Sequence, residues 1–256
     1  MSGTAGVGHY VSWNGGCLLI GRSVGLVPIH SHYAIQVAFG SEPGIRFRTS
    51  EREDWTSYGG VLIPSRQPHA MDATNVPANG VMFIEPETRE GRVLHERYLH
   101  DAIVSMPAEA IAETMGLFEA WKQFNRGAMV AACWRVIGAL TGDEQPREPS
   151  DERILRAIAY INANLDRKVT LDDVAGAAFL SPSRFRHLFV EQTGLALRPY
   201  ILWRRFLLVW ELAMQGKSMS EAAHAAGFAD AAHLTRTCKR TFGFPPTALQ
   251  FVGKLD

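Results

Sequence analysis

The chain has 256 residues, 46% of them hydrophobic, and a formal net charge of zero. This length is enough for one or two domains with buried cores. The most apolar long stretch, residues 200–210, is interrupted by two arginines, and the first residues lack the basic and apolar parts of a signal peptide, so we expect neither a membrane span nor a leader. Widely separated cysteines without metal-ligand spacing predict reduced thiols in a cytoplasmic protein: Cys17, Cys133 and Cys238.

Charge is distributed unevenly along the chain. From Asp151 onwards there are 14 lysines and arginines against 10 acidic residues, a balance of +4, whereas the preceding part has 12 against 16, a balance of −4. A basic C-terminal part beside an acidic N-terminal part is typical of a nucleic-acid-binding domain attached to a separate sensor.

The N-terminal part has the pattern of a β domain. Residues 1 to about 16 are rich in glycine and predict a mobile arm. Short apolar runs then alternate with turn sequences, and no helical pattern separates them; the runs are CLLIGR, IHSHYAIQVAF, IRFR, GVLIP and VMFIE. Many short strands without intervening helices predict a small sandwich or barrel.

A helical pattern begins after the β region. Residues 85–94 are charged and predict a solvated turn. Two amphipathic patterns follow within 101–140 and predict an antiparallel pair of helices, with apolar faces made of Ile111, Met115, Phe118 and Trp121 in the first and Val130, Trp134 and Ile137 in the second. Such a pair can form a dimer contact or can cover the β domain. The polar segment 141–152 lacks periodicity and predicts a linker.

One pattern occurs twice in the C-terminal part. Residues 171–194 and 220–243 each combine a short alanine-rich helix, a tight turn, a capping residue and a second helix that ends at glycine. Ser181, followed by Pro182, caps the second helix of the first copy, and Asp230 caps that of the second copy. The inward positions of the two helices recur at helical spacing: Phe185, Leu188 and Phe189, then Leu234, Cys238 and Phe242.

Each copy therefore predicts a helix-turn-helix, and one helix over residues 199–215 joins the two. At about 1.5 Å per residue this helix is about 25 Å long. Two recognition helices on one face of B-DNA must lie about 34 Å apart, and a rigid connector of this size predicts a tandem DNA-reading unit.

These residues resemble the DNA-binding domain of AraC-type transcriptional regulators. The resemblance covers residues 151–251 and rests on VTLDDVAGAAFLSPSRFRHLF, TGLALRPYILWRRF and EAAHAAGFADAAHLTRTCKRTFGFPPT. Phe179 departs from it, because the family often has glycine at this first turn. The segments PIHSHYAIQVAFG and GVLIPSRQPHAMD resemble the cupin-like sensor domain that such regulators often carry.

The resemblance implies an α+β chain. Its expected parts are a cupin-like β-sandwich or barrel in residues 1–100, two helices in 101–140, a linker in 141–152 and an all-α tandem helix-turn-helix domain in 153–256.

The resemblance also implies which side chains contact DNA, because a recognition helix reads bases through the outward residues of its first turns. Carried over position by position, these contacts fall in the first copy on Ser183, Arg186 and His187, beside the outward Arg184. In the second copy they fall on Ala232, His233 and Arg236, and Arg236 is the strong base donor there. Lys239 and Arg240 lie further along this helix and are better placed for phosphates.

Four polar residues of the β region, His30, His32, Gln36 and His69, fall where metal-binding cupins place His, His, Glu and His. Imidazoles that converge inside a barrel suit first-row metals, but a neutral amide at the carboxylate position supplies no charge to a cation. We therefore expect these residues to line an effector pocket or to be structural, with no bound metal and no cofactor.

The leading hypothesis is a non-enzymatic transcriptional regulator, with the family leaning towards activation. It would bind double-stranded DNA, respond to an unknown small-molecule effector and form a homodimer; RNA polymerase is a further candidate partner, and no membrane is involved. One alternative is a metal-dependent cupin enzyme fused to a DNA-binding domain, which rests on the three histidines alone. Another is a regulator that responds to a protein partner.

Overall fold

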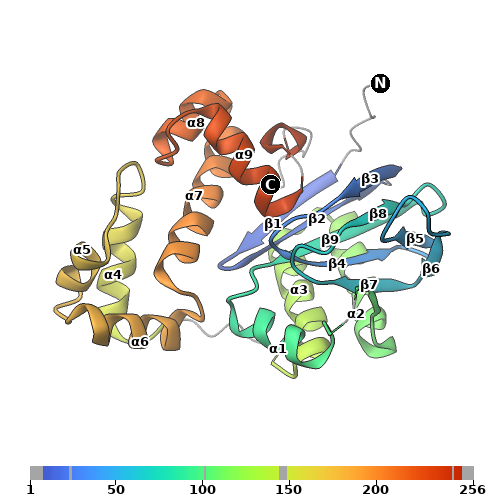
Figure 1. Ribbon diagram of the computed structural model, residues 1–256, viewed down its shortest axis with the longest axis horizontal. Helices are drawn as coiled ribbons and strands as arrows, with labels where there is room; N and C mark the ends of the chain where they lie inside the picture. Colours follow the sequence, from blue (N-terminus) through green and yellow to red (C-terminus); the bar gives the residue numbers. More distant parts are fainter. Residues whose placement is uncertain (1–7, 23–24, 101, 144–148, 244, 250–256) are drawn as a thin grey trace. The chain divides into compact units, whose positions relative to one another are not determined.

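The computed structural model describes residues 8–22, 25–100, 102–143, 149–243 and 245–249. Contacts divide the chain into two compact units, one made of Met1–Pro86, Glu90–Gln145 and Cys238–Asp256 and the other of Glu87–Arg89 and Pro146–Thr237. The first unit holds the strands, and the second consists mainly of helices (Figure 1). The predicted boundaries near residues 100, 140 and 152 stay predictions, and residues 144–148 of the expected linker lie outside the described residues.

The strands form two antiparallel sheets, in agreement with the predicted β domain. The six-stranded sheet has the order β1 (Gly8–Trp13), β2 (Gly16–Arg22), β9 (Ala78–Ile84), β4 (Ile35–Gly40), β7 (Gly60–Ile63) and β10 (Val104–Ser105). The four-stranded sheet has the order β3 (Leu26–His30), β8 (His69–Asp72), β5 (Ile45–Arg48) and β6 (Thr56–Tyr58). Every residue of β4 and β9 is buried, which explains why these strands read as continuous apolar runs.

Strand β1 corrects the prediction of a mobile arm that reaches residue 16. It pairs along its whole length with β2, and Tyr10 and Val11 are buried. The glycines around the run HYVSW made the segment look irregular in the sequence. The run forms a strand because β2 pairs with it. Residues 1–7 of the predicted arm lie outside the described residues.

Residues 85–94 also differ from the prediction, because helix α1 begins at Arg89 and ends at Arg97. Within α1 only Gly91 and Leu94 are buried. A Cβ on Gly91 would lie 2.4 Å from the carbonyl oxygen of Glu85, so the helix approaches the preceding backbone closely. Because α1 buries only these two residues among charged ones, its sequence lacks a clear helical pattern and was predicted to be a solvated turn.

The predicted helix pair is present as α2 (Ala108–Lys122) and α3 (Arg126–Thr141). The two helices pack on each other, and a continuous hydrophobic core joins them to the six-stranded sheet (Figure 1). Met115, which we predicted to face inward, is 52% exposed, and the buried side of α2 passes through Ala110, Thr114 and Leu117. The buried side thus includes small residues, Ala110 and Thr114, which the spacing of the large apolar residues did not indicate.

Trp121 of α2 and Trp134 of α3 both contact strand β1 of the β domain. The indole N–H of Trp121 donates to Nδ1 of His9 at 2.7 Å, and the ring of Trp134 lies 6.1 Å from that of Trp13. Both partners lie on β1. These contacts favour the alternative in which the helices cover the β domain.

The helical region contains α4 (Glu152–Asn162), α5 (Leu171–Ala177), α6 (Pro182–Thr193), α7 (Leu197–Met214), α8 (Met219–Ala225) and α9 (Ala231–Phe242), followed by the 3-10 turn η1 (Pro246–Leu249). The end of α9, from Cys238 onwards, and η1 belong by their contacts to the first unit. The connecting helix α7 agrees with its predicted span to within two residues at each end. Its large buried side chains form the centre of this region: Trp203, Phe206, Val209 and Trp210. No helix in the described part of the chain is long and apolar enough to cross a membrane.

Candidate nucleic-acid interface and histidine cluster

The first helix-turn-helix is built by α5 and α6. Thr170 and Asp173 form a capping box at the start of α5: Asp173 N–H donates to the Thr170 hydroxyl at 3.2 Å, and Thr170 N–H donates to the Asp173 carboxylate at 3.1 Å. Ser181 caps α6 by accepting from Arg184 N–H, and Pro182 occupies the first turn, as predicted. Gly194 ends α6 with a φ of 76°, a left-handed conformation that favours glycine.

The second helix-turn-helix repeats this design in α8 and α9. Ser218 and Glu221 form the capping box of α8. Asp230 accepts from His233 N–H at 2.5 Å and so caps α9, as predicted. The two capping boxes were missed in the sequence, although T-x-x-D and S-x-x-E before short apolar helices are local signals for them.

The turn between the helices uses a left-handed residue in both copies. Phe179 has a φ of 54° and Gly227 a φ of 74°, and each follows the C-cap of its short helix. A Cβ on Gly227 would lie 2.1 Å from the carbonyl oxygen of Leu165, so glycine is required there. Phe179 is tolerated because its side chain is 83% exposed, with the guanidinium of Arg156 at 5.5 Å from its ring.

Helix α6 separates an inward from an outward face. Phe185 and Phe189 are buried, as predicted, and Leu188 is half-buried. All four residues predicted to contact DNA from this helix are exposed: Ser183, Arg184, Arg186 and His187. An exposed row of two guanidiniums, an imidazole and a hydroxyl on one short helix can donate to base edges and phosphates.

Helix α9 has the same division, except that one predicted contact residue is not fully exposed. Leu234, Cys238 and Phe242 are buried, and the predicted contact residues Ala232, Arg236, Lys239 and Arg240 are exposed. His233 is half-buried instead, and its Nδ1 accepts from Ala229 N–H at 3.2 Å. Its ring also lies 5.5 Å from that of Phe228. His233 therefore holds the turn, which depends on contacts that helical spacing does not reveal.

Two arginines attach the scaffold helix α7 to α4 and to the segment that follows α4. Arg204 donates to the side-chain oxygen of Asn162 at 2.9 Å, and Arg205 donates to the carbonyl oxygen of Arg167 at 2.8 Å.

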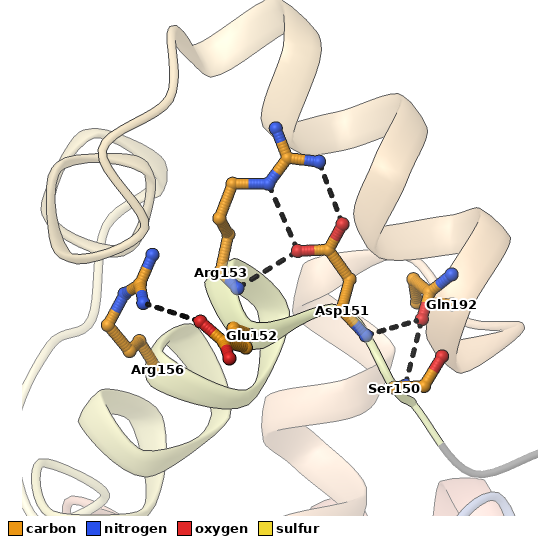
Figure 2. Close-up of polar contacts among 6 residues, drawn as sticks. All are labelled: Ser150, Asp151, Glu152, Arg153, Arg156 and Gln192. Carbon is orange, nitrogen blue, oxygen red and sulfur yellow. Dashed lines mark hydrogen bonds and ion pairs between the residues drawn. The ribbon is translucent and has the colours of Figure 1, made fainter.

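The N-terminal end of the helical region is anchored to Gln192 of α6. Figure 2 shows that the Gln192 side-chain oxygen accepts from the N–H groups of Ser150 and Asp151, at 3.0 and 3.2 Å. Asp151 also caps α4 and pairs with Arg153 at 2.7 Å, so the chain enters the helical region in a defined position (Figure 2).

The second candidate site lies in the β domain. The structure brings His30, His32 and His69 together, as predicted, with one ring nitrogen from each within 4.8 Å of the others. His30 ends β3 and His69 begins β8, and these two residues are paired across the strands. Gln36, on β4, lies 2.9 Å from Nε2 of His32 through its side-chain oxygen.

Burial keeps two imidazoles of this cluster uncharged. It lowers the pKa of His32 to about 4 and the pKa of His69 to about 3, so both imidazoles are neutral at pH 7. His69 is fully buried, and its Nε2 has no hydrogen-bond partner among the described residues. Neutral imidazoles with free lone pairs are ligands and acceptors, and the described cluster contains no carboxylate or thiolate.

Two capped helix-turn-helix units joined by one scaffold helix define a DNA-binding domain of the tandem helix-turn-helix class. A family of helix-turn-helix domains matches residues 174–250. This match and the similarity to transcriptional regulators agree with the predicted AraC-type helix-turn-helix domain in the C-terminal part of the chain.

Two curated relatives are similar to this part. The probable transcriptional regulator LumQ of Photobacterium leiognathi is 32% identical over 93 residues, which cover 36% of this chain and 38% of LumQ. The transcriptional regulator YidL of Escherichia coli K12 is 31% identical over 104 residues, 40% of this chain and 35% of YidL. The matches thus span little more than a third of the relatives' own length.

A solved structure of ToxT from Vibrio cholerae with a bound unsaturated fatty acid covers 96% of this chain and 96% of its own, at 12% identity and a TM-score of 0.49.

Proposed function

We propose that the protein is a sequence-specific, DNA-binding transcriptional regulator whose β domain receives a signal. The observation that carries this proposal is the duplicated, capped recognition helix with an exposed basic face, present in α6 and again in α9. A single exposed arginine would be an ordinary surface charge, whereas exposed arginines on the outward faces of two capped recognition helices support DNA contact. The similarity to transcriptional regulators supports a regulatory role over the enzyme alternative.

The contacts divide into two kinds. We assign base reading to Arg186 and Arg236, because a guanidinium can form a bidentate pair with guanine. Ser183, Arg184, His187 and Ala232 complete the outward faces. Lys239 and Arg240 are assigned to phosphates, and His233 to support of the turn.

The wider parts of the proposal rest on the family resemblance. We propose a small-molecule effector at the cluster of His30, His32, Gln36 and His69, and self-association through the outer faces of α2 and α3, where the Met115 side chain is exposed. RNA polymerase would be the partner of an activator. The protein would carry out this role, without catalysis of its own, in the cytoplasm.

Paired substitutions test the DNA assignment, with operators selected from genomic fragments that the full-length protein retains. We expect Arg236→Ala to cost about 1–3 kcal/mol of specific binding and to relax selectivity in one half of the site. Lys239→Ala should weaken binding to all sequences about equally and reduce the salt-dependence slope by about 1. Binding is measured by titration over a range of salt concentrations and operator variants.

Lys122→Ala is the matched control, because Lys122 is an exposed lysine on α2, paired with Glu119 at 2.8 Å. It should leave affinity and salt slope unchanged. Identical profiles for Arg236→Ala and Lys239→Ala across the operator variants would contradict the division into base and phosphate contacts.

A further inference from the structure

The last turn of α9 is capped by two backbone amides that precede β4. The last carbonyl groups of a helix find no amides within the helix, so other donors must satisfy them. The N–H of Tyr33 donates to the carbonyl oxygen of Arg240 at 2.8 Å. The N–H of Ala34 donates in the same way to Thr241 at 3.0 Å. All four residues lie in the first unit, which thus includes the end of a recognition helix.

Side-chain packing holds the same turn. Thr241 and Phe242 are buried, and the ring of Phe242 lies edge-on to that of Phe83 on β9, with 5.6 Å between the ring centroids. The ring of Phe83 also lies edge-on to that of His32, at 5.2 Å. The end of α9 is therefore attached to the strands by its side chains as well as by its backbone.

Gly243 brings this turn against two rings of the histidine cluster. Its φ of 82° is left-handed, as is common for a glycine that ends a helix. A Cβ on Gly243 would lie 2.6 Å from Cδ2 of His30 and 3.1 Å from Cδ2 of His32. Movement of either imidazole therefore changes the space available to the end of α9.

The first recognition helix ends differently. The hydroxyl of Thr193, the last residue of α6, donates to the carbonyl oxygen of Phe189 at 2.7 Å and accepts from the N–H of Leu195 at 3.2 Å. Phe242 stands at the matching position of α9 and has no hydroxyl for such bonds. The end of α6 is thus stabilised locally, whereas the end of α9 uses residues from the β domain.

We propose that residues 30–34, the capping segment, position the second recognition helix and carry a signal from the histidine cluster to it. The segment contains two of the clustered histidines and both capping amides, so the contacts from the cluster to the helix are continuous. Because α9 is one helix over Ala231–Phe242, the position of its last turn sets that of Arg236. Reading by α6 does not depend on this segment.

The capped state is the one that reads DNA. With the cap formed, Arg236, Lys239 and Arg240 are exposed, so the assigned base and phosphate contacts are available. Release of the cap deprives the last carbonyl groups of their donors and frays the turn that carries Lys239 and Arg240. A ligand that displaces His30 or His32 would therefore weaken the second copy and spare the first. This inference rests on the proposed DNA binding.

Hydrogen exchange of the full-length protein without DNA tests the cap directly. The amides of Tyr33 and Ala34 should be protected in the wild type. Gly243→Ala should speed their exchange by about tenfold or more, because left-handed strain and contact with His30 oppose the capped state. Gly194→Ala is the matched control, since it introduces the same strain at the end of α6, where φ is 76°. It should leave both amides unchanged.

Two further measurements make the exchange result specific. Adding His30→Ala to Gly243→Ala should restore part of the protection, because it removes the ring that the new Cβ would meet. Strain at Gly243 alone would not respond to this second substitution. Protection of β9, every residue of which is buried, should persist in all variants and shows that they are folded.

Footprinting on the selected operators tests the consequence for DNA reading. Gly243→Ala should lose protection in the patch that Arg236→Ala weakens and keep the other patch. Unchanged exchange of Tyr33 and Ala34 in Gly243→Ala, no rescue by His30→Ala, or equal loss of both patches would overturn the proposal. A wild-type protein that protects no operator would contradict the proposed function instead, and the exchange of the two amides would still decide whether the cap exists.

Discussion

Gly227 and Phe179 occupy the same place in the two turns, yet they tolerate substitution differently. Both adopt a left-handed φ, which disfavours any side chain. At Phe179 the side chain extends into solvent, whereas at Gly227 the backbone of Leu165 and the guanidinium of Arg205 occupy the space a Cβ would need. The second turn is therefore packed against the segment after α4, whereas the first turn faces solvent at Phe179.

We predict that Gly227→Ala lowers the free energy of unfolding of the helical region by at least about 2 kcal/mol, since left-handed strain adds to a backbone clash. Gly176→Ala is the matched control: Gly176 lies within α5, and a Cβ there would meet nothing within 4 Å. It should raise stability by about 0.5–1 kcal/mol. Hydrogen exchange of the helical region measures both, and changes of the same sign would contradict the packing of this turn.

At the scale of elements, the shortest helices of the domain depend on their first turns. Helices α5 and α8 have seven residues each, too few to be stable in isolation. Each begins with a complete capping box, which satisfies two backbone N–H groups that the helix itself cannot. The hydrogen bond from the Thr170 hydroxyl lowers the pKa of Asp173, and that from the Ser218 hydroxyl lowers the pKa of Glu221.

This arrangement predicts sensitivity to a cap deletion and to acid. Thr170→Ala should cost about 1 kcal/mol, measured by hydrogen exchange of the α5 amides at pH 7. Because the folded pKa of Asp173 is depressed, its contribution is present above the unfolded value of about 3.9 and is lost as the pH falls through the folded value. Asp173→Asn should remove this part of the acid sensitivity, whereas Asp172→Asn, outside the box, should retain it. Equal acid profiles for the two variants would contradict the role of the box.

At the scale of the whole molecule, one chain carries two recognition helices, and α7 sets their separation. Its 18 residues are about 27 Å long at about 1.5 Å per residue. Successive major grooves on one face of B-DNA are about 34 Å apart, so two heads on this scaffold are suited to adjacent grooves. The buried aromatic residues of α7 and its arginine contacts make the connector rigid.

We therefore predict two protected patches about 10 base pairs apart on one face of the operator, measured by footprinting with the full-length protein. Insertion of about 5 base pairs between the patches should reduce specific affinity sharply, because one head would then face the wrong side of the duplex. Bending of the DNA could recover this contact only at a cost of several kcal/mol. An insertion of about 10 base pairs controls for the change in length, since it keeps the two patches on one face. A harmless half-turn insertion would mean that only one copy reads sequence. That copy would be α6, which carries two arginines in its first turns, whereas α9 begins with alanines.

The features predicted best from the sequence are those whose causes are local. Ser181, Asp230 and Gly194 cap helices through bonds to residues a few positions away, so their roles are readable from spacing alone. The same holds for the duplicated pattern, the inward Phe185 and Leu234, and the exposed arginines of α6 and α9. The sequence by itself thus determined the helix-turn-helix architecture and its outward faces.

The tertiary structure decided the features that depend on distant partners. Strand β1 forms because β2 pairs with it, and Met115 is exposed because the buried side of α2 lies elsewhere on the helix. His233 is half-buried because it contacts Ala229 and Phe228. The histidine cluster needed both kinds of information. Spacing identified His30, His32 and His69, but only the folded strands brought a carbonyl oxygen to each Nδ1 and left the Nε2 of His69 without a partner among the described residues. A ring's tautomer depends on which group lies beside it, and for these rings that group is positioned by the fold.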